Sequence, residues 1–254
     1  MLPAIVPLAA LGLWELLAWL RTESLNWKLP AAFVAAMAVV LMPMPPQHPE
    51  PEQVEAGTIL AEAWLAAGRP DLAEPLLRQC IERQGDWSRN FNLHGLCLRR
   101  LGREDEAANA FKFAIAVAPG DPEAWMNLAV QNSDHGRFPE AEADFARALA
   151  TGPAGANLEF NLGLFRQRQG RMEEAEKRYR IATLLDPTYT QAFTNLGVIL
   201  MLRGDPQAAA AEFEESLRLA PDDPRVRVNY AAALAETGDR AKARRELDRI
   251  LRHY

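Results

Sequence analysis

The fold is decided by a stretch of 34 residues, Pro122–Gly155, which reads PEAWMNLAVQNSDHGRFPEAEADFARALATGPAG. Trp125, Leu128, Ala129 and Asn132 stand at the i, i+3, i+4 and i+7 spacing of one helix face. Gly136 interrupts this pattern, and a glycine suits the turn after a helix because it tolerates positive φ. A second helical run follows over Pro139–Ala150, and Pro153 ends it because proline cannot continue a helix. The stretch therefore predicts two packed helices joined by a tight turn.

The same pattern recurs at a fixed interval of 34 residues. Glycines stand at the turn position of every unit: Gly68, Gly102, Gly136, Gly170, Gly204 and Gly238. An alanine follows five residues after each of them: Ala73, Ala107, Ala141, Ala175, Ala209 and Ala243. A strict interval of this length is typical of a stacked array, because each unit must offer the next one the same contact. We therefore expect an all-α array over residues 54–254, with units 54–87, 88–121, 122–155, 156–189, 190–223 and 224–254.

The order of residue types in each unit resembles the tetratricopeptide repeat family. An early Trp or Phe is followed by Leu-Gly or Leu-Ala, then by Gly, Ala, an aromatic residue, Ala and Pro, as in the unit 122–155. The resemblance covers residues 54–254. It implies a right-handed superhelical solenoid of six helix pairs, with a concave groove lined by the first helix of each pair.

Composition excludes several classes of function. The chain has a net charge of −6, and residues 54–254 hold 26 basic and 30 acidic residues, which argues against a nucleic-acid binder. The four histidines are scattered, and we find no nucleophile–base arrangement, phosphate loop or metal-ligand spacing. We therefore expect no catalytic residues, no metal and no cofactor. Cys80 and Cys97 fall on helices that should be neighbours, so a disulfide and two reduced core residues are both compatible with the sequence.

The first 53 residues differ from the rest. Leu2–Leu20 is apolar with one charge, Glu15, and Leu29–Met42 is apolar with none. We predict that residues 1–42 form a two-helix membrane anchor, and that the proline-rich residues 43–53 are an extended linker. A cleaved signal peptide and a single anchor followed by an interfacial segment are the alternatives. The signal peptide is disfavoured because a charged start is missing and a second apolar run follows the first.

The orientation of this anchor follows from its few charges. Arg21 and Lys28 lie between the two apolar runs, so the positive-inside rule puts this loop in the cytoplasm. The array would then lie in the periplasm, held at a bacterial inner membrane. A charged Glu15 within an apolar layer costs free energy, so we expect it to contact a polar group of a membrane partner.

One position of the first helices indicates a binding surface. The sixth residue of four consecutive units is an asparagine: Asn127, Asn161, Asn195 and Asn229. An asparagine amide both donates and accepts, so it can hold the backbone of an extended peptide. In tetratricopeptide repeat proteins such asparagines line the groove, and the resemblance implies a protein or peptide ligand. A structural role between neighbouring helices is the alternative.

Other residues are expected to complete this groove. Four arginines lie on its predicted side and favour an acidic section of ligand: Arg89, Arg99, Arg100 and Arg168. Met126 and Phe160 would form apolar pockets between the amides, an arrangement that suits a partner helix or an extended segment. The lysines of the carboxylate clamp found in chaperone-binding members of the family are missing, since Glu123, Asn157 and Gln191 stand at their places.

We therefore predict a membrane-tethered scaffold that binds a protein or peptide in its groove and supports the assembly or stability of a membrane-associated complex. The layout resembles the repeat component of bacterial cytochrome c maturation, with a shorter cytoplasmic loop. An accessory subunit of a large membrane enzyme and a regulatory component of a polysaccharide or glycosyl transferase system are the alternatives.

Overall fold

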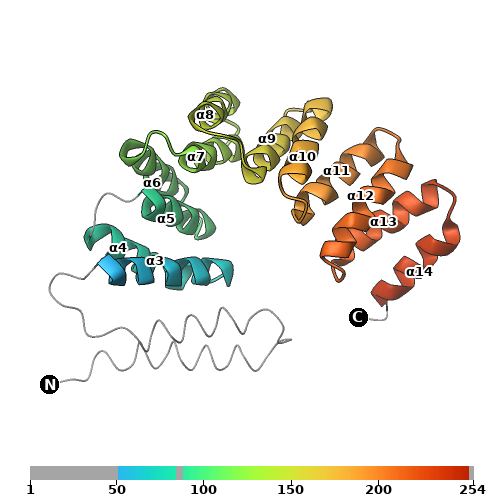
Figure 1. Cartoon of the computed structure of the whole chain (residues 1–254), viewed down its shortest axis with the longest axis horizontal. Helices are drawn as coiled ribbons and strands as arrows, with labels where there is room; N and C mark the ends of the chain where they lie inside the picture. The colour runs from blue at the N-terminus through green and yellow to red at the C-terminus, as the bar shows by residue number, and fades with distance from the viewer. Residues whose placement is uncertain (1–50, 84–87, 252–254) are drawn as a thin grey trace, which may run out of the picture. The chain divides into compact units, whose positions relative to one another are not determined.

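The computed structural model describes residues 51–83 and 88–251, and these residues are helical with short connections (Figure 1). Two compact units divide between Asn127 and Leu128. The N-terminal unit holds α3 (Pro51–Ala66), α4 (Pro70–Arg83), α5 (Ser88–Arg100) and α6 (Glu104–Val117). The helix α7 (Pro122–Asp134) begins in this unit and ends in the C-terminal one. The C-terminal unit continues with α8 (Phe138–Thr151), α9 (Ala156–Arg168), α10 (Met172–Leu185), α11 (Thr190–Leu202), α12 (Pro206–Leu219), α13 (Pro224–Glu236) and α14 (Arg240–Leu251).

The helices alternate between the first and the second member of a pair, as the repeat pattern predicts. The first helices α5, α7, α9, α11 and α13 each begin at the first residue of a 34-residue interval. The described part of the chain contains no β-strand. The prediction of an all-α array of helix pairs is therefore confirmed.

The turn glycines adopt the positive φ that their place after the first helices predicts. All six turn glycines have φ between 71° and 92°, a region that residues with a Cβ rarely adopt. At the turn between α9 and α10, Gly170 N donates to Gln167 O at 2.9 Å, and Arg171 N donates to Arg166 O at 2.9 Å. These two bonds satisfy carbonyls that the end of α9 would otherwise leave without partners, and they reverse the chain into the second helix.

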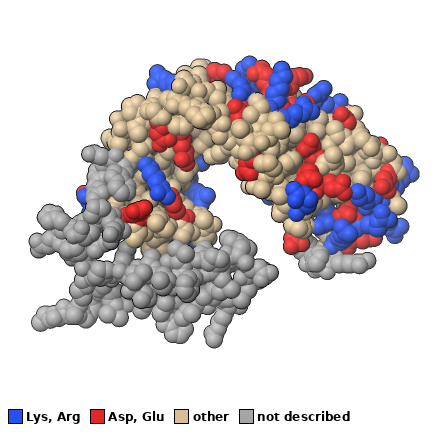
Figure 2. Space-filling model, in the orientation of Figure 1, with Lys and Arg blue, Asp and Glu red and all other residues tan. Residues whose placement is uncertain are grey.

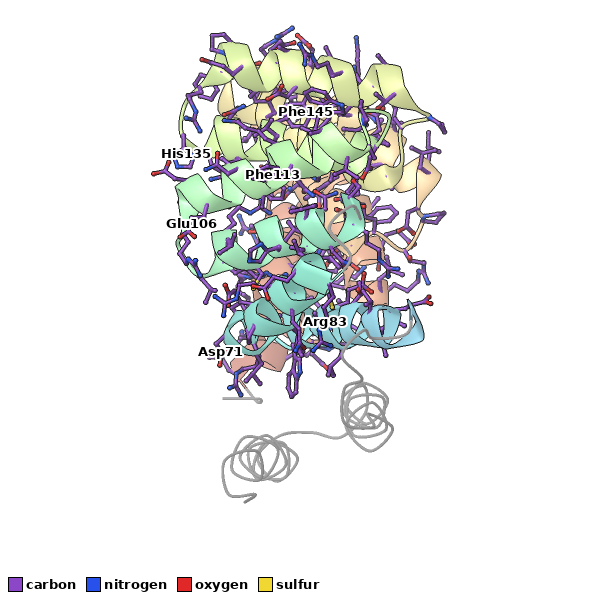
Figure 3. The ribbon with its side chains drawn as sticks, turned by 90° about the vertical axis from the view of Figure 1, so that its left-hand side faces the viewer. Asp71, Arg83, Glu106, Phe113, His135 and Phe145 are labelled. Carbon is purple, nitrogen blue, oxygen red and sulfur yellow. The ribbon has the colours of Figure 1, made fainter. Side chains whose placement is uncertain are left out.

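The four central helix pairs each pack around an aromatic side chain of the second helix: Phe111, Phe145, Tyr179 and Phe213. Tyr179 and Phe213 are fully buried. A Cβ built on Gly163 would lie 2.5 Å from Cε1 of Tyr179, so the ring occupies the space where a larger residue of α9 would stand. The equivalent rings of Phe111 on α6 and Phe145 on α8 are also buried. Phe113, two residues after Phe111, is largely exposed; Figure 3 labels Phe113 and Phe145. Small residues in the first helices thus allow the rings of the second helices to close the pairs.

The two cysteines are separate, reduced core residues. Cys80 Sγ lies 3.6 Å from Val54 O, and Cys97 Sγ donates to Pro70 O at 3.0 Å. Of the two alternatives left by the sequence, the structure therefore has the free thiols.

The predicted membrane hairpin, its Glu15 and most of the proline-rich linker lie outside the described residues. In the part of the chain that is described, none of the helices combines the length and the apolarity needed to cross a bilayer.

Candidate functional site

The candidate site is one face of the first helices of the C-terminal unit. We call it the first-helix surface, and define it by the apolar side chains of α9, α11 and α13 at template positions 5, 9, 12 and 13: Phe160, Leu164, Val198, Met201, Leu202 and Val228. Phe160, Leu164, Val198 and Met201 are half-buried and pack on the core below them. Leu202 and Val228 remain 68% and 49% exposed. The three successive first helices α9, α11 and α13 therefore each have apolar side chains that are partly exposed.

Three asparagines lie on the same first helices as these apolar side chains, and each amide has a different environment. Asn161 Nδ2 donates to the carbonyl and the side-chain oxygen of Asn157, at 2.8 and 2.9 Å. Asn195 hydrogen-bonds the buried phenol of Tyr179; burial raises the pKa of Tyr179, and this hydrogen bond counteracts the rise in part. Asn229 is half-buried, and its side chain forms no hydrogen bond with the other described residues. The amide of Asn229 is thus the one most open to a ligand backbone.

An aromatic cluster closes the α9 end of the first-helix surface. The ring of Phe160 lies 4.9 Å from that of Tyr189 and 5.7 Å from that of Tyr179, measured between centroids. The hydroxyl of Tyr189 donates to Asn157 Oδ1 at 3.2 Å. These contacts hold Phe160 in place, so that it offers a ring edge of fixed position rather than a mobile side chain.

Arg168 supplies the positive charge beside the first-helix surface. Its Nη1 contacts the carboxylate of Asp134 and donates to Ser133 Oγ at 3.1 Å. Both Arg168 and Asp134 are partly exposed. An acidic ligand group would therefore compete with Asp134 for this guanidinium.

The structure places the first asparagine of the predicted series differently. Asn127 is buried in the N-terminal unit, and its Nδ2 donates to Asn92 Oδ1 at 3.1 Å, which links α7 to α5. Met126 beside it is also buried. At these two positions the side chains contribute to the packing of the unit, as the structural alternative for the asparagines describes.

The predicted arginines of the N-terminal unit already bind partners within the chain. Arg89 forms a two-point pair with Glu62, at 2.9 and 2.8 Å. Arg100 donates to Leu65 O, and Arg99 is half-buried on the same helix. Arg89 and Arg100 thus link α5 to α3, so the N-terminal unit offers less open positive charge than the sequence suggests.

Sequence reasoning did not select Leu202, Asn157 or Tyr189 for this surface. Leu202 could have been found by counting, since it stands one 34-residue interval after Arg168. For Asn157, the sequence indicates only that it stands where chaperone-binding members of the family have a lysine. Tyr189 lies in the connection after α10, where the repeat pattern sets no residue type, so no signal marked it.

The surface has the chemistry of a binding site. Apolar side chains, amides and one guanidinium are the groups that hold a polypeptide segment. The described residues contain no cluster of three or more His, Cys, Asp or Glu side chains able to hold a metal ion.

Models of the tetratricopeptide repeat match residues 92–156, 132–183 and 160–224, and further models of the same repeat match 54–79 and 200–254. The matches cover well over half of the chain. The chain belongs to the tetratricopeptide repeat family. No curated protein matches the sequence.

Solved structures of tetratricopeptide repeat proteins resemble this fold. PilF of Pseudomonas aeruginosa is 28% identical, with a TM-score of 0.61 over 65% of this chain and 75% of PilF. PilW, described as a type IV pilus biogenesis factor, is 18% identical, with a TM-score of 0.67 over 79% of this chain and 93% of PilW. YrrB, described as a repeat protein with an unusual peptide-binding site, is 19% identical, with a TM-score of 0.53 over 69% of this chain and 90% of YrrB. As a tetratricopeptide repeat protein, the chain is a scaffold of the kind that binds protein or peptide partners.

Proposed function

We propose that the chain holds a polypeptide segment of a partner protein on the first-helix surface of α9, α11 and α13. The observation that supports this most is the exposure of Leu202 on α11 and of Val228 on α13, where Asn229 follows Val228 with an open amide. Apolar anchors bind a partner through their buried area, and a neighbouring amide fixes the direction of its backbone. Arg168 adds a preference for an acidic residue at the α9 end.

The test is a selection of random 12-residue peptides displayed on phage against the full chain, followed by affinity measurements on variants. The variants Leu202→Asp and Val228→Asp place a charge in the proposed contact and should weaken the selected peptides by tenfold or more, roughly 1.4 kcal/mol. Leu184→Asp is the matched control, because Leu184 is 80% exposed on the second helix α10. Equal loss of affinity in the control and the two variants would contradict the proposal.

We further propose that residues 2–42 tether this scaffold to a bacterial inner membrane, with the array in the periplasm, and that it supports a membrane-associated complex there. The support is the two apolar runs of the sequence and the basic residues between them. Fractionation of the full chain and of a chain lacking residues 2–42 tests the tether. The full chain should sediment with membranes and be cleaved by protease added to spheroplasts, and a full chain protected until lysis would contradict the periplasmic placement.

A further inference from the structure

The last helix exposes two apolar residues whose equivalents one repeat earlier, on α12, are buried. In α12, Phe213 and Leu217 are buried, and α12 packs against the following first helix, α13. The same positions 34 residues later are Leu247 and Leu251 on α14. These two side chains are 44% and 75% exposed. Within the described residues no first helix follows α14. Its apolar residues are therefore left without the helix against which the equivalent residues of α12 pack.

The first described helix shows the reciprocal feature. In α5, Cys97 faces the preceding second helix, since its thiol donates to Pro70 O of α4, and it is fully buried. The same position of α3 is Ala63, which is only half-buried. Ile59 occupies the position at which Asn195 of α11 reaches Tyr179 of the preceding helix, and it is 43% exposed. The side of α3 on which a second helix would pack is therefore open among the described residues.

The two open helices carry opposite charges. The sequence of α14 has a formal charge of +3, from Arg240, Lys242, Arg244, Arg245, Arg249, Glu246 and Asp248. The sequence of α3 has a formal charge of −3, from Glu52, Glu55 and Glu62. Arg89 of α5 pairs with Glu62, which leaves the charges of Glu52 and Glu55 for a partner. Arg240, Arg244 and Arg245 are exposed, and no ion pair joins them to other described residues. Figure 2 shows the basic atoms gathered at the C-terminal end of the chain.

We propose that α14 of one molecule docks on α3 of a second copy of this chain. The contact would repeat the junction between a second helix and the next first helix, with Leu247 and Leu251 against Ile59 and Ala63. Charge complementarity favours this occupant over a second α14, whose arginines would repel the first set. Because the two surfaces differ, the contact is heterologous, and each dimer keeps one open surface of each kind for further growth. This association is separate from the peptide surface on α9, α11 and α13.

The experiment uses two full-length chains that differ in size by a tag. One carries Ile59→Cys, the other carries Leu251→Cys, and the mixture is oxidised under mild conditions. We expect a disulfide-linked dimer of the two different chains. The matched control replaces Leu251→Cys by Leu184→Cys, which has a similar exposure on α10 and lies outside the proposed junction. Both native thiols are buried and do not compete.

Charge reversal provides the second readout. Arg244→Glu combined with Arg245→Glu should lower the yield of the mixed dimer about tenfold, since like charges then meet at the contact. Glu55→Arg in the partner chain should restore part of this yield. Preferential formation of Leu251→Cys homodimers, or an equal yield with the Leu184→Cys control, would overturn the proposal. Binding of the monomeric chain to vesicles of anionic lipid, without a mixed dimer, would assign α14 to a membrane surface and overturn it too.

Discussion

Replacing Gly163 by alanine tests the close packing on which the array depends. The added Cβ would lie 2.5 Å from Cε1, 2.7 Å from Cδ1 and 3.1 Å from Cζ of Tyr179. Ordinary contact begins near 3.4 Å, so the ring or the helix must move by up to about 1 Å. The ring cannot turn aside easily, because it is fully buried and its hydroxyl donates to Gln167 Oε1 at 2.7 Å.

Two effects of opposite sign decide the result. Alanine in a helix interior is about 1 kcal/mol more favourable than glycine. Overpacking a closed core costs about 1–3 kcal/mol. We therefore expect Gly163→Ala to lower the free energy of unfolding by about 1 kcal/mol, although intrinsic helix propensity alone predicts an increase.

The assay combines urea unfolding of the full chain with amide hydrogen exchange, because the stability of a repeat array is partly local. Faster exchange should appear in α9 and α10. Gly120→Ala is the control, since a Cβ at Gly120 meets no atom within 4 Å. In a Tyr179→Leu background the ring is gone, and Gly163→Ala should become stabilising. A stabilising Gly163→Ala in the presence of Tyr179 would refute the packing argument.

Three further predictions concern single side chains. Arg166→Ala should cost about 1–2 kcal/mol, because this buried guanidinium binds Glu142 at two points, whereas Arg171→Ala, at an exposed pair, should cost under about 0.5 kcal/mol in the same urea titration. The pKa of Glu142 is lowered chiefly by its hydrogen bond to Arg166, so the stability that this pair contributes is present above the unfolded pKa near 4.5 and is lost as pH falls. The difference in unfolding free energy between wild type and Arg166→Ala should therefore be smaller at pH 3 than at pH 7, and an unchanged difference would count against this cause. Burial raises the pKa of Cys97 to about 11, so its contribution to stability is complete below pH 9 and disappears as pH rises toward 11; the difference in unfolding free energy between wild type and Cys97→Ala should shrink over that interval, and a constant difference would exclude this cause.

The sequence predicted the fold because the fold depends on features that recur at a fixed interval. The turn glycines and the alanines that follow them serve the same contact in all six units, and a buried ring recurs in the four central ones, so the copies of one pattern could be read together. The starts of the first helices could be counted for the same reason.

The site was less predictable, because equivalent positions have different neighbours. Asn127 and Asn195 occupy the same template position, yet one amide binds Asn92 and the other binds Tyr179. Arg89 is exposed but paired with Glu62, a partner 27 residues away that no local pattern indicates. The exposure of Leu202 depends on how α11 packs in the C-terminal unit, and the repeat template does not fix that residue.

Amide hydrogen exchange of the full chain, with and without a display-selected peptide, tests the central claim most directly. The account predicts slower exchange in α9, α11 and α13 on binding, with α10 and α12 unchanged, and no such protection in the Leu202→Asp variant. Protection confined to the second helices, or equal protection in wild type and Leu202→Asp, would contradict the claim that the first-helix surface holds the partner.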